Sequence, residues 1–308
     1  MIPVVAALPL RELLDGPQRV VTVLARFPHA AYLQLAIDAE PAPVIALVTS
    51  DGIAHPNSLV LTRPAAARPL ASVHRGEAAM IGDGALWLGG EQYRPVRWWS
   101  PVPALASVDA DMLAVTSSLL GSHLDVRSQA LPQELGYPLR SVQEALTAGR
   151  VRPAAAAARD LVGRGPGLTP AGDDVLAGLL AAGSALSAVV APTVPEVRRA
   201  IDEFGAATVA DAVGRTTAIS LELLRQAAAD AVLAPAGRLL RALVHTDDLS
   251  GGRIVVAADE LLAVGSTSGR DLAVGLHAGA ALVAGAATGV VPGPSRRSIA
   301  AVPAGAVA

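Results

Sequence analysis

The sequence predicts an α+β protein, with a β-rich N-terminal barrel or sandwich followed by a helical bundle. Short β-branched runs bounded by Pro, Gly or Asp fill the first hundred residues, whereas helical spacing dominates after residue 108. With 308 residues, the chain is long enough to bury a large core. Its composition, 52% hydrophobic and 17% charged, is typical of globular proteins and not of disordered ones.

The N-terminal part carries the β signals. Four runs are predicted strands: 19–27, 30–37, 43–50 and 57–62. Gly-Asp-Gly at 82–84 and Gly-Gly at 89–90 are typical of hairpin turns. Five to seven short antiparallel strands of this kind fit a small barrel or sandwich, which we place at residues 1–105.

The rest of the chain is predicted to be an α-helical domain over 106–292, followed by a flexible Pro/Gly/Ala tail over 293–308. The run GRIVVAA at 252–258 is compatible with a strand or with the opening of a helix. Two uncharged stretches, 175–194 and 272–291, are long enough to cross a membrane. Their small residues and the lack of an aromatic belt or of flanking arginine clusters predict buried core helices and no membrane partner.

Composition disfavours several function classes. A net charge of −3, no basic block and 3% aromatic residues argue against a nucleic-acid partner. The absence of cysteine excludes disulfides and cysteine-based sites and fits a cytoplasmic protein. Lysine is also absent, since all 24 basic residues are arginine, so a P-loop and a Schiff base are excluded. A bound anion would therefore be held by arginine, hydroxyls and backbone N–H groups.

The stretch GRGPGLTPAGDDVLAG, 163–178, concentrates turn chemistry between two predicted helices. The first helix should end near Val162, stopped by Gly163, and the second should begin at Asp173 or just before it. A helix N-terminus attracts anions, and glycines let the backbone approach a ligand closely. The candidate substrate-binding residues here are Gly165, Gly167 and Gly172, and the candidate catalytic residues are Thr169, Asp173 and Asp174.

The two aspartates are expected to differ in role, because consecutive helix residues point about 100° apart. Asp173, directly after Gly172, is the better helix cap. Asp174 is then the functional carboxylate, as a proton acceptor or as a magnesium ligand. A purely structural alternative is a cap, a first-turn carboxylate and a tight connection.

A second stretch, GSTSGRD at 265–271, precedes another helix of small apolar residues. Its candidate binding residues are Ser268 and Arg270. As a structural alternative, Ser268 and Asp271 fit a capping box.

A third stretch, GRTT at 214–217, sets Arg215 beside Thr216 and Thr217 as candidate binding residues. Guanidinium groups pair well with carboxylate and phosphate. The alternative is that Arg215 only closes a helix C-terminus. We expect all three stretches to line one pocket.

Histidine motifs point to no metal site. His55, His123 and His277 stand near polar motifs, but no HExxH and no pair at metal-ligand spacing occurs. His277 is expected to be a core histidine. No protein-held metal or cofactor is predicted, although Mg²⁺ is possible, and no GxSxG hydrolase motif is present.

GRGPGLTPAGDDVLAG resembles the GxGxGLTPSGDDxLxG signature of the AllH family, with Ala171 at the serine position. GRTT and GSTSGRD are similar to later motifs of that family, so the resemblance covers about 160–290 and the β-rich part only in outline. It implies a subunit of the oxamate carbamoyltransferase system of allantoin breakdown. The reaction would convert oxalurate and phosphate into oxamate and carbamoyl phosphate, or the reverse. The implied partners are a small anionic substrate, an FdrA-like acyl-CoA-synthetase-like subunit and a third subunit.

Two alternatives to a carbamoyltransferase stay open. PAGDDVLAGLLAAGSAL, 170–186, is also similar to the Gly-Ala-Gly-Asp helix start of ribokinase-like sugar kinases. That fold requires alternating strands and helices, with a strand ahead of the motif. The other alternative is a non-catalytic subunit that binds small anions while a partner carries out the chemistry.

Overall fold

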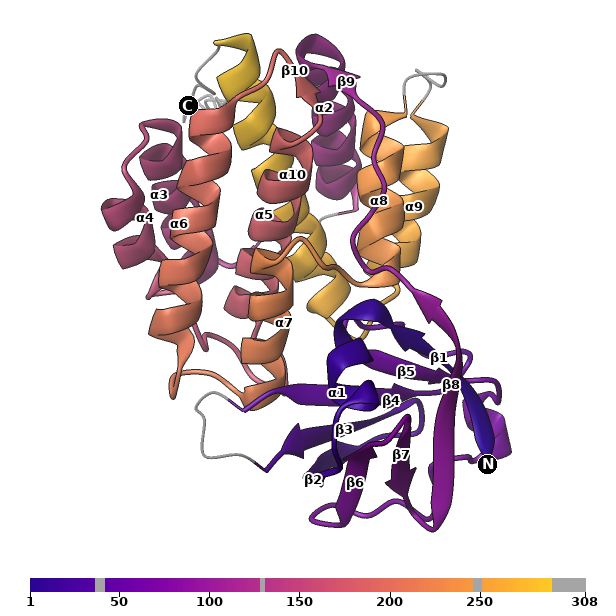
Figure 1. Ribbon diagram of the computed structural model, residues 1–308. Helices are drawn as coiled ribbons and strands as arrows, with labels where there is room; N and C mark the ends of the chain where they lie inside the picture. The colour runs from indigo at the N-terminus through magenta and orange to yellow at the C-terminus, as the bar shows by residue number, and fades with distance from the viewer. Residues whose placement is uncertain (37–41, 128–130, 246–250, 290–308) are drawn as a thin grey trace, which may run out of the picture.

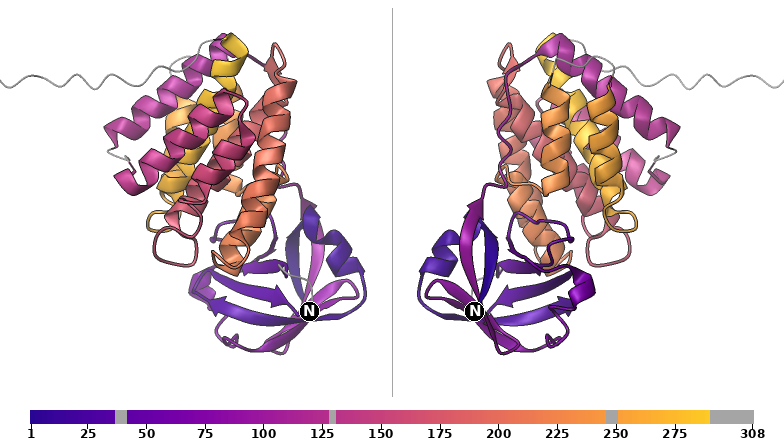
Figure 2. Two further views of the ribbon diagram at one scale, coloured as in Figure 1. Left: turned by 90° about the vertical axis from the view of Figure 1, so that its left-hand side faces the viewer. Right: turned by 90° about the vertical axis from the view of Figure 1, so that its right-hand side faces the viewer.

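The computed structural model describes residues 1–36, 42–127, 131–245 and 251–289. They form an N-terminal closed barrel followed by a helical bundle, which confirms the predicted α+β class. The barrel lies at one end of the bundle, as Figure 1 and the two side views of Figure 2 show. The predicted tail over 293–308 lies outside the described residues.

The barrel closes in the strand order β1-β5-β4-β3-β2-β6-β7-β8. Its strands are β1 Ile2–Ala7, β2 Arg19–Arg26, β3 Ala30–Leu35, β4 Val44–Val48, β5 Ser58–Leu61, β6 Ala78–Gly82, β7 Ala85–Leu88 and β8 Glu91–Trp99. The short helix α1, Arg11–Asp15, follows β1. The four predicted strands are confirmed. The prediction of five to seven antiparallel strands is wrong, because β1–β8 and β4–β5 pair in parallel.

Alternate residues along each strand point into the barrel, and their apolar side chains fill its interior. Residues such as Leu33 on β3 and Ile45 on β4 are fully buried in its interior. Both predicted hairpin turns are confirmed: Asp83 and Gly84 have φ values of 42° and 76°, and Gly89 and Gly90 have 60° and 78°. Positive φ at both central residues matches the strand twist, which explains the glycines.

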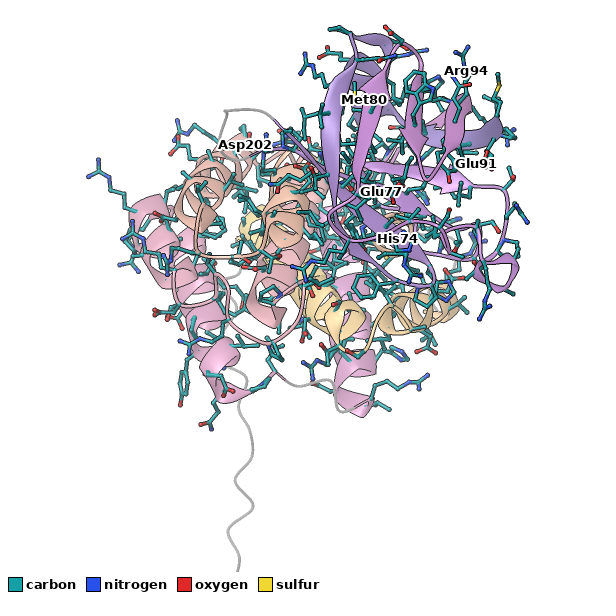
Figure 3. All side chains as sticks on the ribbon, turned by 90° about the horizontal axis from the view of Figure 1, so that it is seen from below. His74, Glu77, Met80, Glu91, Arg94 and Asp202 are labelled. Carbon is teal, nitrogen blue, oxygen red and sulfur yellow. The ribbon has the colours of Figure 1, made fainter. Side chains whose placement is uncertain are left out.

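A carboxylate connects two loops of the barrel. Glu77 accepts hydrogen bonds from the backbone nitrogens of His74, at 2.9 Å, and Gly89, at 3.0 Å. The loop before β6 is thereby tied to the β7–β8 turn. Figure 3 shows His74 and Glu77 close together in the view from below, with Asp202 away from them on the bundle.

The bundle follows after a linker. Its helices are α2 Ala110–Val126, α3 Gln133–Thr147, α4 Val151–Ala158, α5 Ala171–Ser187, α6 Pro195–Ala212, α7 Ala218–Ala228, α8 Ala234–Val244, α9 Gly252–Leu262 and α10 Ser268–Thr288. The run 252–258 therefore opens a helix. A two-stranded parallel pair, β9 Val108–Asp109 with β10 Val190–Ala191, was not predicted. The barrel ends at Trp99 and α2 begins at Ala110, on either side of the predicted boundary.

Helices α5 and α10 pack against each other in the centre of the bundle, as predicted for the two small-residue stretches. A Cβ on Gly275 would lie 2.1 Å from the Val175 carbonyl oxygen, and one on Gly178 would lie 2.3 Å from that of Leu272. Only glycine permits this approach. Among the described residues, α10 alone is long and apolar enough to cross a membrane by composition, and most of its apolar stretch is buried inside the protein.

The fold required by the kinase alternative is not formed. Between residues 150 and 289, the described part of the chain contains only the two-residue strand β10. The segment before the 163–178 stretch is helix α4 and a turn, not a strand. A ribokinase-like sheet is therefore excluded for these residues.

The barrel and the bundle meet at α7 and α8 (Figure 1). The backbone nitrogen of Val44 on β4 donates to the Glu222 carboxylate on α7, at 3.4 Å. At the start of α8, the Ala234 nitrogen donates to the Ala54 carbonyl, at 3.1 Å. These contacts hold the start of β4 against α7 and the β4–β5 connection against the start of α8.

Candidate functional site

The three predicted stretches meet where α5, α7 and α10 begin. Thr169 Oγ1 lies 3.0 Å from Ser268 Oγ, joining the first stretch to the second. Thr217 Oγ1 donates to the Leu168 carbonyl, and Thr216 Oγ1 donates to Asp173, joining the first to the third. The three stretches therefore lie together, whereas the expectation that all three line one pocket stays a prediction.

Asp173 holds these segments together and does not cap its own helix. Its carboxylate is almost completely buried and accepts from Gly163 N at 2.9 Å, from Ser220 Oγ at 2.8 Å and from Thr216 Oγ1. The predicted cap is wrong because α5 begins at Ala171, with Pro170 as N-cap and no side-chain cap bond. The earlier start points the Asp173 carboxylate away from the α5 backbone, toward α7 and the turn after α4.

We expect Asp173→Asn to lower the free energy of unfolding by about 2 kcal/mol or more, because an amide nitrogen, which cannot accept, would replace one of the two oxygens that accept from these donors. Urea unfolding of the variant, beside an Asp160→Asn control on the exposed turn after α4, measures this. Equal stability of the two variants would contradict the assigned role.

Asp174 sits in a different environment. Its side chain is 7% exposed, and its buried Oδ2 has no hydrogen-bond partner among the described residues. Burial raises its pKa to about 8, hydrogen bonds from Ser268 and Thr169 oppose this shift, and the nearby Asp271 and Asp173 add to it. A carboxyl group of this kind exchanges a proton near neutral pH, as general acid–base catalysis requires.

Asp271 is a second buried carboxyl that sequence reasoning considered only as part of a cap. It is fully buried, and Arg270 donates to its Oδ1 from Nε at 2.8 Å and Nη2 at 2.6 Å. Burial raises the pKa of Asp271, and Arg270 opposes that shift. The predicted capping box is not formed, because α10 begins at Ser268 and its N-cap, Thr267, makes no side-chain cap bond. The Arg270 charge is thus directed at Asp271.

Arg215 lies outside this cluster. It is exposed, and its Nη2 donates at 2.8 Å to the Arg159 carbonyl at the C-terminal end of α4. The alternative in which it closes a helix C-terminus is the one the structure shows. Thr217 acts as the N-cap of α7 by accepting from Ser220 N at 3.1 Å.

The glycines of the first stretch divide into two kinds. A Cβ on Gly172 would lie 2.0 Å from the Leu161 carbonyl oxygen, so this glycine serves helix packing and not ligand approach. Gly165 and Gly167 are exposed, with φ of 115° and 100°. Within the described ranges, no group accepts a hydrogen bond from their backbone nitrogens. These two N–H groups are available to an anion.

The histidines lie elsewhere. His55 is partly buried on the outside of the barrel beside Tyr32, and this burial lowers its pKa to about 4. His123 bonds to Asp259 of α9 at 2.9 Å. His277 is partly buried on α10 with its ring against Gly121 of α2, and this burial lowers its pKa. In the described part of the chain, no group of three or more His, Asp or Glu side chains is placed to hold a metal ion.

A small apolar pocket of about 30 Å³, here called the junction pocket, reaches Asp174 at the meeting of the barrel and the bundle. Its lining includes Pro56 of the β4–β5 connection, Asp174, Ala177 and Ala181 of α5, Ala227 of α7 and Ala236 of α8. Asp174 is the one charged residue in that lining. Sequence reasoning missed the pocket because its walls are alanines and other apolar residues from separate segments, with no motif to mark them.

The fold and this site define a class: a barrel-and-bundle α+β protein with a buried, partly unpartnered carboxyl group where three helices begin. Residues 161–280 match the family model for oxamate carbamoyltransferase subunit AllH, which confirms the predicted resemblance. The match includes all three stretches and leaves the barrel outside it. The family name fits a subunit of a multi-protein carbamoyltransferase system of allantoin breakdown. No solved structure matches the chain.

Proposed function

We propose that the chain is a carbamoyltransferase-type subunit that binds a small anionic substrate where α5, α7 and α10 begin. The observation that carries this proposal is the buried, partly unpartnered carboxyl of Asp174 beside the Ser268 and Thr169 hydroxyls. The family match over 161–280 supports the reaction type. The substrate pair is oxamate with carbamoyl phosphate, or oxalurate with phosphate in the reverse direction.

In the carbamoylation direction, the amide nitrogen of oxamate attacks the carbamoyl carbon. A C–N bond forms, the C–O bond to phosphate breaks, and Asp174 accepts the proton that the nitrogen loses. A pKa of about 8 lets the same carboxyl return that proton in the reverse direction. The N–H groups of Gly165 and Gly167 are the donors for the oxygen that gains negative charge. A preorganised donor of this kind is typically worth about 3–4 kcal/mol.

The predicted roles of the arginines change in this scheme. Arg215 is bonded to Arg159 and Arg270 is bonded to Asp271, so neither side chain is held ready for an anion. We infer that an FdrA-like subunit or a third subunit supplies the missing positive charge, while Asp174 of this chain moves the proton.

Thermal-shift measurements with carbamoyl phosphate, oxamate, oxalurate and phosphate test substrate binding. A ligand at 100 times its dissociation constant should add about 2.7 kcal/mol to stability. We expect stabilisation by at least one of these anions, and less in Ser268→Ala than in Ser122→Ala, a control on the exposed side of α2. Oxalurate phosphorolysis, assayed with and without the two partner subunits, then separates the catalytic from the binding role. No stabilisation by any of the four anions would refute the proposal.

A further inference from the structure

The junction pocket has an apolar lining that a purely polar substrate would leave unfilled. Its surface is mostly apolar, and three alanines, Ala177, Ala181 and Ala227, leave open the space that larger side chains would fill. At its polar end stands Asp174, whose Oδ2 is buried without a partner among the described residues. An uncharged group that donates to this oxygen would also meet apolar walls.

We propose that the ligand of this site carries a short uncharged aliphatic group, which occupies the junction pocket beside an amide or carbamoyl end bonded to Asp174. The identity of the polar end rests on the proposed function, whereas the aliphatic group follows from the pocket itself. The ligand class is thus a short-chain aliphatic amide or ureido compound, which would take the place of oxamate or oxalurate in the proposed reaction. A charged group is disfavoured, because the walls offer it no partner.

The size of the pocket limits the aliphatic group. A volume of about 30 Å³ accommodates roughly two water-sized groups, since one such group needs about 10–15 Å³. The pocket therefore accepts a chain of about two carbons. Longer chains would have to displace the alanine-bearing helices, which pack tightly in the core of the bundle.

The barrel takes part in this recognition through Pro56. The turn that carries Pro56 is held on both sides: Asn57 Nδ2 donates to the Val44 carbonyl at 2.6 Å, and Ser58 Oγ donates to the His55 carbonyl at 2.7 Å. Pro56 itself is buried and lines the pocket together with residues of α5, α7 and α8. The barrel thus provides a fixed wall that limits the length of the ligand.

A series of neutral primary amides tests the proposal: acetamide, propionamide, butyramide and valeramide, titrated into the full chain by NMR. Each methylene that enters the pocket should strengthen binding about fourfold, and the gain should stop once the pocket is full. Ala227→Val and Ala236→Val, on different helices, should end the gain one methylene earlier. Ala229→Val, on the exposed end of α7, should leave the series unchanged.

Three outcomes would overturn the proposal: no amide binding, affinity independent of chain length, or an equal effect of Ala229→Val and both pocket variants. Near-ultraviolet circular dichroism checks that each variant is folded. If Ala227→Val fails to fold, Ala236→Val is used in its place. The same experiments distinguish failure of the proposed function from failure of the pocket proposal. A rising amide series without binding of carbamoyl phosphate or oxamate refutes the reaction and keeps the pocket, whereas anion binding with a flat amide series does the opposite.

Discussion

Asp174→Asn is expected to lower carbamoyl transfer about 100- to 10,000-fold, the range typical for loss of a general acid or base. Asparagine keeps the shape of the protonated carboxyl but can neither accept nor return a proton. The rate of transfer, measured across pH 6 to 10 in the complete system, checks this. The wild-type rate should follow a titration near pH 8, and the residual rate of the variant should not.

The same substitution should increase stability at alkaline pH. Asp174 has a pKa of about 8 in the folded protein, against an ordinary value of 3.8. Between these values the folded protein holds a proton that the unfolded chain releases, so wild-type stability falls as the pH rises from about 4 to about 8. The variant lacks this loss, so its advantage should be absent near pH 4 and largest above pH 8. The pKa difference sets an upper limit of about 6 kcal/mol.

Asp160→Asn, on the exposed turn after α4, serves as the control and should alter neither rate nor stability. If Asp174→Asn transfers carbamoyl groups at the wild-type rate, the proton acceptor lies elsewhere in the complex. If its stability follows the same pH dependence as the wild type, the carboxyl of Asp174 is ionised at neutral pH and the acid–base assignment is wrong.

Gly275→Ala is expected to cost about 3 kcal/mol or more and to leave little folded protein. The added Cβ would lie 2.1 Å from the Val175 carbonyl oxygen and 3.0 Å from Gly178 Cα. Both neighbours are backbone atoms of α5, so relief requires the two central helices to move apart. The loss should appear as a lower yield of soluble protein and a lower midpoint of urea unfolding.

Gly136→Ala on α3 provides the matched control, since the added Cβ would meet only Arg140 Nη1, at 3.5 Å. There the higher helix propensity of alanine should add up to about 1 kcal/mol. Equal urea midpoints for the two variants would show that α5 and α10 do not pack as closely as the structure has them.

Local sequence was sufficient for much of the fold. Strand runs such as 19–27 and the hairpin glycines at 82–84 depend on neighbouring residues alone, and the structure confirms both. Pairing was not predictable in the same way. The parallel contact of β1 with β8 joins residues about 90 positions apart. The sequence of either strand does not indicate which strand it will pair with.

The candidate site divides along the same line. Glycines, hydroxyls and carboxylates ahead of small-residue helices marked the three stretches from the sequence alone, because loop chemistry and helix starts are local properties. The separate tasks of Asp173 and Asp174 were decided by tertiary structure. Donors on the Gly163 turn and on α7 satisfy the first, whereas apolar walls from separate segments bury the second. The burial and charge pairing of a side chain depend on neighbours that are distant in sequence. Only the folded structure therefore determines them.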